Sequence, residues 1–315
     1  MEISKYETNS LKGVAIFLVV AAHIMGNYLG DYFGNYEYFL NVLGTGGVCV
    51  FFVLSGYGVY MSFYEKGITN TYWNNKFKKI FIPYWGVTII YFIITRKVSF
   101  TILLKNLLFV DYERNIDGTM WYMSFLILWY LIFYLLYKFE IPDLFRICFL
   151  FIISGAIYEN SYFFRGCGWQ FQQNIISFPL GVLAASCICR LKRKIEIKKI
   201  VLYLMTLLIG ILYVYGIIRN TVFQKLGIIL VMFLILLIKT IIKSDLKCKA
   251  FYIVGTYSYF VYLIEGKILE ILPRLQNAIL NSVIYVLILV LITYAYASIS
   301  NSNTKLRERI GISTK

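Results

Sequence analysis

The only histidine of the chain, His23, lies eleven residues after Lys12 in the stretch NSLKGVAIFLVVAAH. Eleven residues make about three turns of an α-helix, so both side chains lie on one face, about 16 Å apart along its axis. Imidazole gains and loses a proton near neutral pH, as a general base must. An ionisable group inside an apolar, membrane-spanning helix is costly and usually faces a cavity. We therefore take His23 as a candidate for proton transfer, with a structural hydrogen bond between helices as the alternative.

A second ionisable group lies in another apolar stretch, GTYSYFVYLIEGKIL, which contains Glu265. Ser258, Tyr262 and Glu265 are spaced by four and three residues, so they share one helix face. A carboxylate within a membrane needs a partner or takes up a proton. Because the two stretches place Glu265 at a depth similar to that of His23, we expect Glu265 to face the cavity that holds His23.

Two further motifs combine basic, small and hydroxyl residues. KFKKIFIPYW places Lys76 and Lys79 one helical turn apart. The preference of cytoplasmic segments for positive charge explains them, and so does a phosphate ligand, which ammonium groups bind as point charges. GTGGVCVFFVLSGYGVYMSF contains Gly56 and Gly58, which let helices approach closely, and Ser55, which places a hydroxyl within the helix.

The elements that carry these residues are long apolar runs. The chain has 315 residues, of which 60% are hydrophobic and 15% are charged, and its mean hydropathy is +0.71. Soluble domains are closer to half apolar and a quarter charged. Since a span in lipid satisfies its own backbone hydrogen bonds, we expect an all-α integral membrane protein, a bundle of about ten transmembrane helices. The expected spans are 11–29, 46–62, 80–95, 121–137, 144–158, 171–189, 199–217, 225–243, 251–270 and 280–300.

The basic residues orient this bundle. Most of the 31 lysines and arginines lie between alternate spans, which predicts that both termini are cytoplasmic. The first helix is expected to be retained, because no small-residue cleavage site follows it. Residues 96–119 form the longest expected outside loop, with an amphipathic stretch, and 191–199 form a solvated basic loop. We expect one membrane domain over residues 1–300 and a basic cytoplasmic tail over 301–315.

Several function classes fit poorly. A net charge of +15 is typical of nucleic-acid binding, but here the basic residues act as topology signals, so no nucleic-acid partner is expected. The cysteines fit neither a disulfide framework nor a tetrahedral metal site, and with a single histidine we expect no metal. The six cysteines are Cys49, Cys148, Cys167, Cys187, Cys189 and Cys248.

Taken in order, the motifs resemble those of the type 3 membrane acyltransferase family, which O-acylates bacterial surface glycans and other envelope acceptors. NSLKGVAIFLVVAAH resembles the family's basic residue, ten residues, histidine pattern, and GTGGVCVFFVLSGY resembles its FFVLSG signature. The other matching segments are KFKKIFIPYW, MWYMSFLILWYLIFYLL, NIISFPLGVLAA and GTYSYFVYLIE. Together they span residues 9–270, nearly the whole expected membrane domain.

This resemblance implies acyl transfer from acetyl-CoA, bound from the cytosol, to an acceptor hydroxyl in the outer half of the membrane. His23 takes the place of the catalytic histidine, and Lys12, Lys76 and Lys79 take the cofactor-binding positions. Lysine replaces the arginines common there, which keeps the charge but loses bidentate contacts. Glu265, a second catalytic candidate, stands where many members have another histidine. The substrate-binding candidates are Ser55, Tyr57, Trp121 and Tyr262.

The resulting hypothesis is a tunnel from the basic residues to His23, through which the pantetheine arm reaches a carbohydrate or lipid-linked glycan acceptor. The expected location is a bacterial inner or plasma membrane, with membrane lipids as further partners. The acyl group, the acceptor and the oligomeric state stay open. Two alternatives are a polytopic transporter or flippase, and a polymerase of surface polysaccharide. The first more often has internal repeats, which this chain lacks, and the second typically has a larger outside loop.

Overall fold

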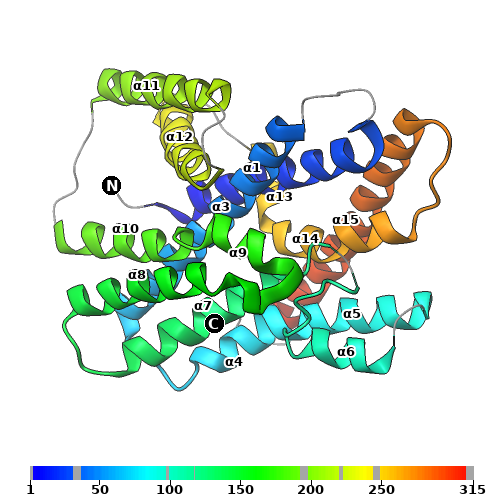
Figure 1. The fold of residues 1–315 in the computed structure, drawn as a ribbon, viewed down its shortest axis with the longest axis horizontal. Helices are drawn as coiled ribbons and strands as arrows, with labels where there is room; N and C mark the ends of the chain where they lie inside the picture. Colours follow the sequence, from blue (N-terminus) through cyan, green and yellow to red (C-terminus); the bar gives the residue numbers. More distant parts are fainter. Residues whose placement is uncertain are drawn as a thin grey trace.

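The computed structural model describes residues 3–30, 37–96, 99–116, 118–191, 198–219, 223–243 and 249–309. Every regular element in these ranges is helical (Figure 1). The elements are α1 (Lys5–Ile24), η1 (Met25–Leu29), α3 (Glu37–Lys66), α4 (Tyr72–Lys76), η3 (Phe77–Phe81), α5 (Ile82–Thr95), α6 (Phe100–Leu107), α7 (Trp121–Lys138), α8 (Asp143–Glu159), η4 (Ser161–Cys167), α9 (Gly168–Asn174), α10 (Ser177–Leu191), α11 (Lys199–Ile218), α12 (Phe223–Lys243), α13 (Lys249–Thr256), α14 (Ser258–Ile271) and α15 (Ala278–Arg309).

Within the described ranges, eight helical segments are long and apolar enough to cross a membrane. The chain is therefore an all-α, multi-pass membrane protein. Two of the ten expected spans differ from this set. Residues 144–158 form α8, which has 17 residues, and residues 251–270 are divided between α13 and α14, which meet at Tyr257. Parts of the expected loops and tail, at 31–36, 192–197 and 310–315, lie outside the described residues.

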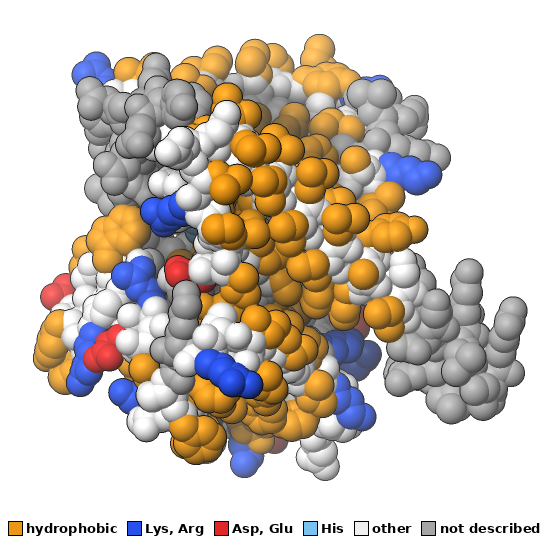
Figure 2. Space-filling model, turned by 90° about the vertical axis from the view of Figure 1, so that its right-hand side faces the viewer, with side chains coloured by type: hydrophobic (Ala, Val, Ile, Leu, Met, Phe, Trp, Pro, Cys, Tyr) orange, Lys and Arg blue, Asp and Glu red, His pale blue; other side chains and the backbone are white. Residues whose placement is uncertain are grey.

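The outer surface is strongly apolar, as a lipid-facing surface must be. Figure 2 shows a broad hydrophobic area, with most of the visible lysines and arginines around its margins. Helix α11 contributes large exposed side chains along its length, including Leu204, Leu207 and Ile211, and α15 does the same. Helices α11 and α12 pack together at one edge of the bundle (Figure 1).

Helix α1, which carries Lys12 and His23, packs against α3 and α13 at the centre of the bundle. Glycines set the distance to α13. A Cβ atom at Gly13 would overlap the backbone carbonyl of Phe251, and one at Gly255 would overlap that of Asn9. The two helices therefore cross in backbone contact, which only glycine permits at these positions.

Helices α3 and α10 make a similar close contact. A Cβ atom at Gly56 would overlap the carbonyl of Phe178, and one at Gly181 would overlap that of Val53. The expected role of Gly56 in helix packing is thus confirmed. Gly58 differs, because nothing lies within 4 Å of a Cβ atom built there. Its missing side chain leaves open space rather than permitting a helix contact.

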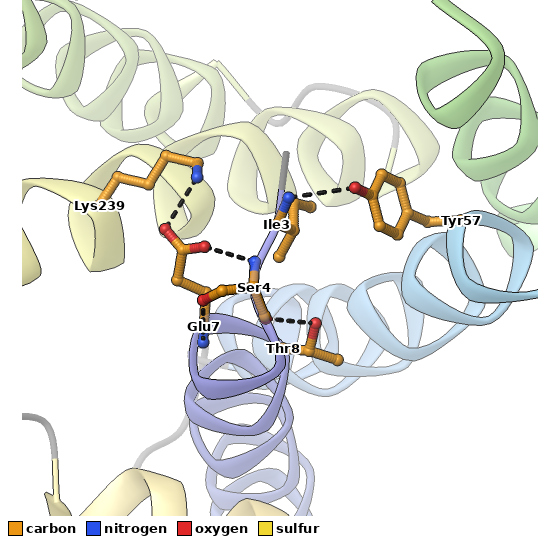
Figure 3. Close-up of polar contacts among 6 residues, drawn as sticks. All are labelled: Ile3, Ser4, Glu7, Thr8, Tyr57 and Lys239. Atoms are coloured by element: carbon orange, nitrogen blue, oxygen red, sulfur yellow. Dashed lines mark hydrogen bonds and ion pairs between the residues drawn. The ribbon is translucent and has the colours of Figure 1, made fainter. Parts of the chain in front are cut away.

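The start of α1 is fixed by a capping box. The Ser4 hydroxyl accepts a hydrogen bond from the Glu7 backbone N–H at 3.2 Å, and the Glu7 carboxylate accepts one from the Ser4 N–H at 2.6 Å (Figure 3). Lys239 Nζ of α12 lies 2.8 Å from the other carboxylate oxygen of Glu7. These contacts fix the position of α1, and therefore the depth of every residue along it.

The core between α7, α9 and α10 consists of stacked aromatic rings. Trp129 lies parallel to Phe178 with ring centroids 5.4 Å apart, and Phe125 lies parallel to Phe171 at 4.1 Å. All four side chains are fully buried. Large rings have few rotamers, so this stack is rigid. It fixes the position of α7 and therefore of the polar side chains on its other face.

Candidate active site

His23 and Glu265 lie in direct contact, as their similar expected depths suggested, although Glu265 itself does not line the cavity beside His23. His23 Nδ1 is 2.9 Å from Glu265 Oε2, and 242 residues separate the two along the chain. The Glu265 side chain is fully buried, whereas that of His23 is 33% exposed. Tyr285 of α15 donates a second hydrogen bond to the same carboxylate oxygen, at 3.2 Å. Three helices, α1, α14 and α15, therefore assemble this group.

The contact relates the roles of the two ring nitrogens to the charge of Glu265. An ionised carboxylate only accepts hydrogen bonds, so opposite an ionised Glu265 the His23 Nδ1 donates and Nε2 carries the lone pair. Oε1 of Glu265 is buried without a hydrogen-bond partner among the described residues. The polar contacts described for this carboxylate therefore all involve Oε2. Because the Glu265 side chain is buried, it holds the ring of His23 from inside the bundle.

Irregular backbone adjoins both functional helices. The π-helical segment η1 begins two residues after His23, and α14 begins at Ser258, directly after the break at Tyr257. Single π turns inside α-helices occur frequently at functional sites, and broken helices in membranes are tolerated where they line a cavity. Tyr28 in η1 and Ser258 at the start of α14 are both buried.

His23 lines a cavity of about 520 Å³, which we call the histidine cavity. Its wall contains two tryptophans, Trp121 and Trp169, and the polar side chains of Asn27, Thr45, Thr119 and Gln170. Arg114 also lines it. With its side-chain amide oriented to satisfy its neighbours, Gln170 accepts a hydrogen bond from Arg114 Nη1 at 2.6 Å. Aromatic faces next to amide and hydroxyl groups suit a ligand that has both apolar faces and hydroxyls.

The loops beside this cavity are tied together at the surface. Arg165 forms an ion pair with Glu113, and this guanidinium keeps the pKa of the Glu113 carboxyl below its ordinary value. Asp111 accepts hydrogen bonds from Asn106 at 2.5 Å and from Asn115 at 2.7 Å. Asp111 and Glu113 are therefore both engaged in contacts within these loops.

A second cavity, of about 740 Å³, contains the basic residues, and we call it the lysine cavity. Lys12, Lys76 and Lys79 all line it, together with Lys66 at the end of α3. None of the described lining residues is acidic, so the four positive charges are not balanced within the wall. This is the electrostatic environment that a polyanionic ligand requires.

Two of these lysines are positioned by the segment that precedes α5. Lys76 ends α4, and Lys79 lies within the π-helical segment η3. Lys76 Nζ lies 3.6 Å from the centre of the Tyr130 ring, a cation–π contact with α7. Lys78, between them in sequence, is exposed and does not line the cavity. Lys79 is exposed as well, but it lines the cavity together with Lys76, one helical turn away.

In place of the expected tunnel, the described residues form two adjoining cavities. Tyr122 of α7 and Tyr262 of α14 line both, and no other described residue does. Their ring centroids are 5.1 Å apart, in an edge-to-face arrangement. The tyrosine pair therefore separates the lysine cavity from the histidine cavity by the thickness of one ring contact.

The remaining expected site residues divide between these regions. Ser55 lines the lysine cavity, Trp121 lines the histidine cavity, and Tyr262 lines both. Tyr57 lies apart from both cavities, where its hydroxyl accepts a hydrogen bond from the Ile3 N–H at 3.1 Å near the start of α1 (Figure 3).

Sequence reasoning did not identify Arg114, Tyr122 or Tyr285 as site residues. Tyr122 follows Trp121 in the MWYMSF motif, so the choice of Trp121 as a candidate could have pointed to Tyr122 as well. Tyr285 lies in an apolar run with no motif, and its role depends on how α15 packs against α14. Arg114 lies in a loop, where helical periodicity gives no information.

Comparisons with known proteins identify the family of the chain. No curated protein and no solved structure matches the chain significantly. A family model described as an acyltransferase domain matches residues 5–300, which includes both cavities and every residue that lines them. The chain is a membrane acyltransferase and belongs to the acyltransferase 3 family, the type 3 membrane acyltransferases.

Proposed function

We propose that the protein transfers an acetyl or other short acyl group from cytosolic acyl-CoA to a hydroxyl of a surface glycan or lipid-linked sugar. The observation that carries this proposal is the adjacency of two cavities with different chemistry. One holds four lysines, and the other holds an imidazole in contact with a buried carboxylate. The first suits the phosphates of a donor, and the second suits the deprotonation of an acceptor.

The donor binds in the lysine cavity. Lys12, Lys76 and Lys79 contact the phosphates of CoA, whose charges they compensate as point charges. The extended pantetheine arm then lies along α3, past Ser55 and toward Tyr122. This direction brings the thioester to the wall of the histidine cavity while the nucleotide stays at the mouth of the lysine cavity.

The acceptor hydroxyl binds in the histidine cavity, beside Trp121 and Trp169. His23 Nε2 takes the hydroxyl proton as the oxygen attacks the thioester carbonyl carbon. The carbon–sulfur bond then breaks, and the departing thiolate takes the proton from His23 to leave as CoA. Glu265 holds the ring in the required tautomer and stabilises the imidazolium that forms during transfer. Each turnover therefore returns His23 to its starting state.

The location and orientation follow from the same scheme. The lysine cavity faces the cytosol of a bacterial cell, where acyl-CoA is present, and the histidine cavity faces the outer half of the inner or plasma membrane. Both termini are then cytoplasmic, with about ten membrane-crossing segments that include α8 and the broken α13–α14 pair.

The test uses the purified protein in nanodiscs, radiolabelled acetyl-CoA and glycan-containing membranes from cells that lack the gene. The proposal predicts alkali-labile label in the glycan fraction, together with an equal amount of released CoA. Cells lacking the gene should show a matching loss of glycan O-acetyl groups. Label that crosses the membrane without forming an ester, or an unchanged O-acetyl content, would contradict the proposal.

A further inference from the structure

The wall between the two cavities is a pair of tyrosine rings. Tyr122 and Tyr262 are both buried, and each of them lines both the lysine cavity and the histidine cavity. Their edge-to-face contact, with centroids 5.1 Å apart, is a favourable arrangement for aromatic side chains. Anything that passes from one cavity to the other must displace this contact.

Each ring is held by a contact with another part of the bundle. The Tyr262 hydroxyl donates a hydrogen bond to the Thr119 carbonyl at 2.5 Å, and Thr119 lines the histidine cavity. Tyr122 packs against Phe52 of α3, with centroids 4.7 Å apart.

These contacts restrict how far the wall can open. The hydrogen bond of Tyr262 and the packing of Tyr122 on α3 still allow both side chains to rotate locally. The surrounding helices, in contrast, are held in place by the stacked aromatic core. Because the two rings are in contact, an acyl chain must push them apart to pass, and each further methylene must find room between or beyond the rings.

We propose that Tyr122 and Tyr262 form a gate that passes a short acyl group and excludes longer ones. This inference rests on the proposed function, in which the acyl end of the donor projects from the lysine cavity toward His23. The thioester carbon and the acceptor oxygen must approach to about 3–3.5 Å, which requires the acyl chain to extend between the two rings. The gate thus sets the acyl-chain preference of the enzyme.

The closed gate has a second consequence. It separates the thioester from water in the histidine cavity until an acyl group occupies the opening. In hydrolysis, a water oxygen bonds to the acyl carbon, the carbon–sulfur bond breaks, and the products are a carboxylic acid and CoA. Removing a ring therefore increases CoA release without acceptor as well as relaxing the chain-length preference.

The experiment compares acetyl-, butyryl- and hexanoyl-CoA with the wild type and the variants Tyr122→Leu and Tyr262→Leu. Ester formation and thiol release are measured with protein in nanodiscs and glycan-containing membranes. The preference of the wild type for acetyl over hexanoyl should fall about tenfold or more in both variants, since one methylene in a tight pocket is worth about 10–200-fold. Thiol release without acceptor should rise in the same variants.

Two controls separate the gate from general damage to the core. Tyr262→Phe keeps the ring but loses the hydrogen bond to Thr119, so the chain-length preference should fall much less than in Tyr262→Leu. Tyr137→Leu removes a buried ring that is stacked on Phe133 and lines neither cavity, so it should lower stability without changing the preference. If the leucine variants do not accumulate, Tyr122→Met and Tyr262→Met replace each ring with a flexible apolar side chain.

An unchanged preference in the folded leucine or methionine variants would overturn the gate, and so would an equal shift in Tyr137→Leu. The proposed function would survive either result, because wild-type transfer of acetyl groups tests it separately. A wild type that forms no ester from any acyl-CoA would instead remove the proposed function, and the gate with it.

Discussion

The lysine cavity and the histidine cavity adjoin each other, yet they are built in different ways. Four lysines line the first, with no acidic residue among its described lining residues, and three of the four lie at or near helix ends. The second contains a histidine fixed by a buried carboxylate that α14 contributes. The first is arranged for attraction of a charged ligand, and the second for control of one proton.

This difference indicates how the two cavities should tolerate substitutions. A cavity that works by summed charge loses function gradually as charges are removed, because each lysine contributes independently at partly exposed positions. A buried pair that acts as one unit loses function at once when either member is removed. Substitutions in the two cavities should therefore differ in both size and kinetic character.

The largest effect is expected at Glu265. Glu265→Gln preserves the shape but removes the carboxylate, which in the proposed mechanism fixes the tautomer of His23 and stabilises the imidazolium. We expect kcat for acetyl transfer to fall about 10²–10⁴-fold, the usual contribution of general base catalysis, while KM for acetyl-CoA changes little. Steady-state kinetics with varied acetyl-CoA measure both.

Tyr285→Phe serves as the matched control, because it removes the other hydrogen bond to Glu265 Oε2 and leaves the charge intact. It should lower kcat only a few-fold, in keeping with a hydrogen bond of about 1–3 kcal/mol to a charged group, only part of which is felt in the transition state. An equal loss in both variants would mean that packing, rather than charge, accounts for the role of Glu265.

An intermediate effect is expected in the lysine cavity. Lys76→Gln and Lys79→Gln should each raise KM for acetyl-CoA about tenfold and leave kcat nearly unchanged, because they bind the donor without contacting the reacting atoms. Added salt should weaken donor binding in the wild type more than in the variants.

Lys78→Gln is the control for this prediction, since Lys78 lies between the two lysines in sequence and outside the cavity. It removes the same charge from the same segment. A comparable rise in KM for Lys78→Gln would indicate general attraction of the donor by surface charge and would remove the specific role of the cavity.

Two glycine substitutions in α3 distinguish a glycine that is needed for helix packing from one that faces open space. Gly56→Ala places a methyl group against the Phe178 carbonyl, so we expect a loss of about 1–3 kcal/mol in the free energy of unfolding, a typical cost of overpacking. Gly58→Ala meets open space and should leave the thermal midpoint in detergent nearly unchanged. The reverse order of the two midpoints would contradict the described α3–α10 contact.

The smallest effect is expected at Tyr57, which lies outside both cavities. Tyr57→Phe removes one hydrogen bond to the Ile3 N–H, worth about 1 kcal/mol, and should leave both kcat and KM unchanged. Steady-state kinetics and thermal unfolding of this variant check both expectations. They test whether Tyr57 acts on substrate, as its place in the motif suggests, or only on stability, as its position in the structure suggests. A loss of transfer activity would restore Tyr57 as a substrate-binding residue.

Much of the site could be predicted from the sequence because helical periodicity and membrane depth are simple constraints. The face shared by Lys12 and His23, and the depth shared by His23 and Glu265, follow from a rise of 1.5 Å per residue and the direction of each span. Those rules brought His23 and Glu265 together across 242 residues of sequence.

Other features depend on tertiary packing, which periodicity does not encode. The helix breaks at Tyr257 within an apolar run that the sequence predicts as one span. Hydropathy gives no sign of this break, because it does not report the direction of the backbone. The motif that contains Ser55 and Tyr57 does not reveal that these residues point to different surroundings. The division of the tunnel by Tyr122 and Tyr262 depends on how α7 packs against α14.

The most direct test of the central claim, that His23 is the general base and the lysine cavity binds the donor independently, uses His23→Gln. Glutamine keeps a donor for Glu265, so the buried carboxylate stays partnered, but it cannot take a proton from the acceptor. The measurement pairs the single-turnover rate of acetyl transfer with the Kd for CoA in nanodiscs. We predict a rate at least about 10²-fold below that of the wild type with an unchanged Kd. Transfer at the wild-type rate would contradict the account.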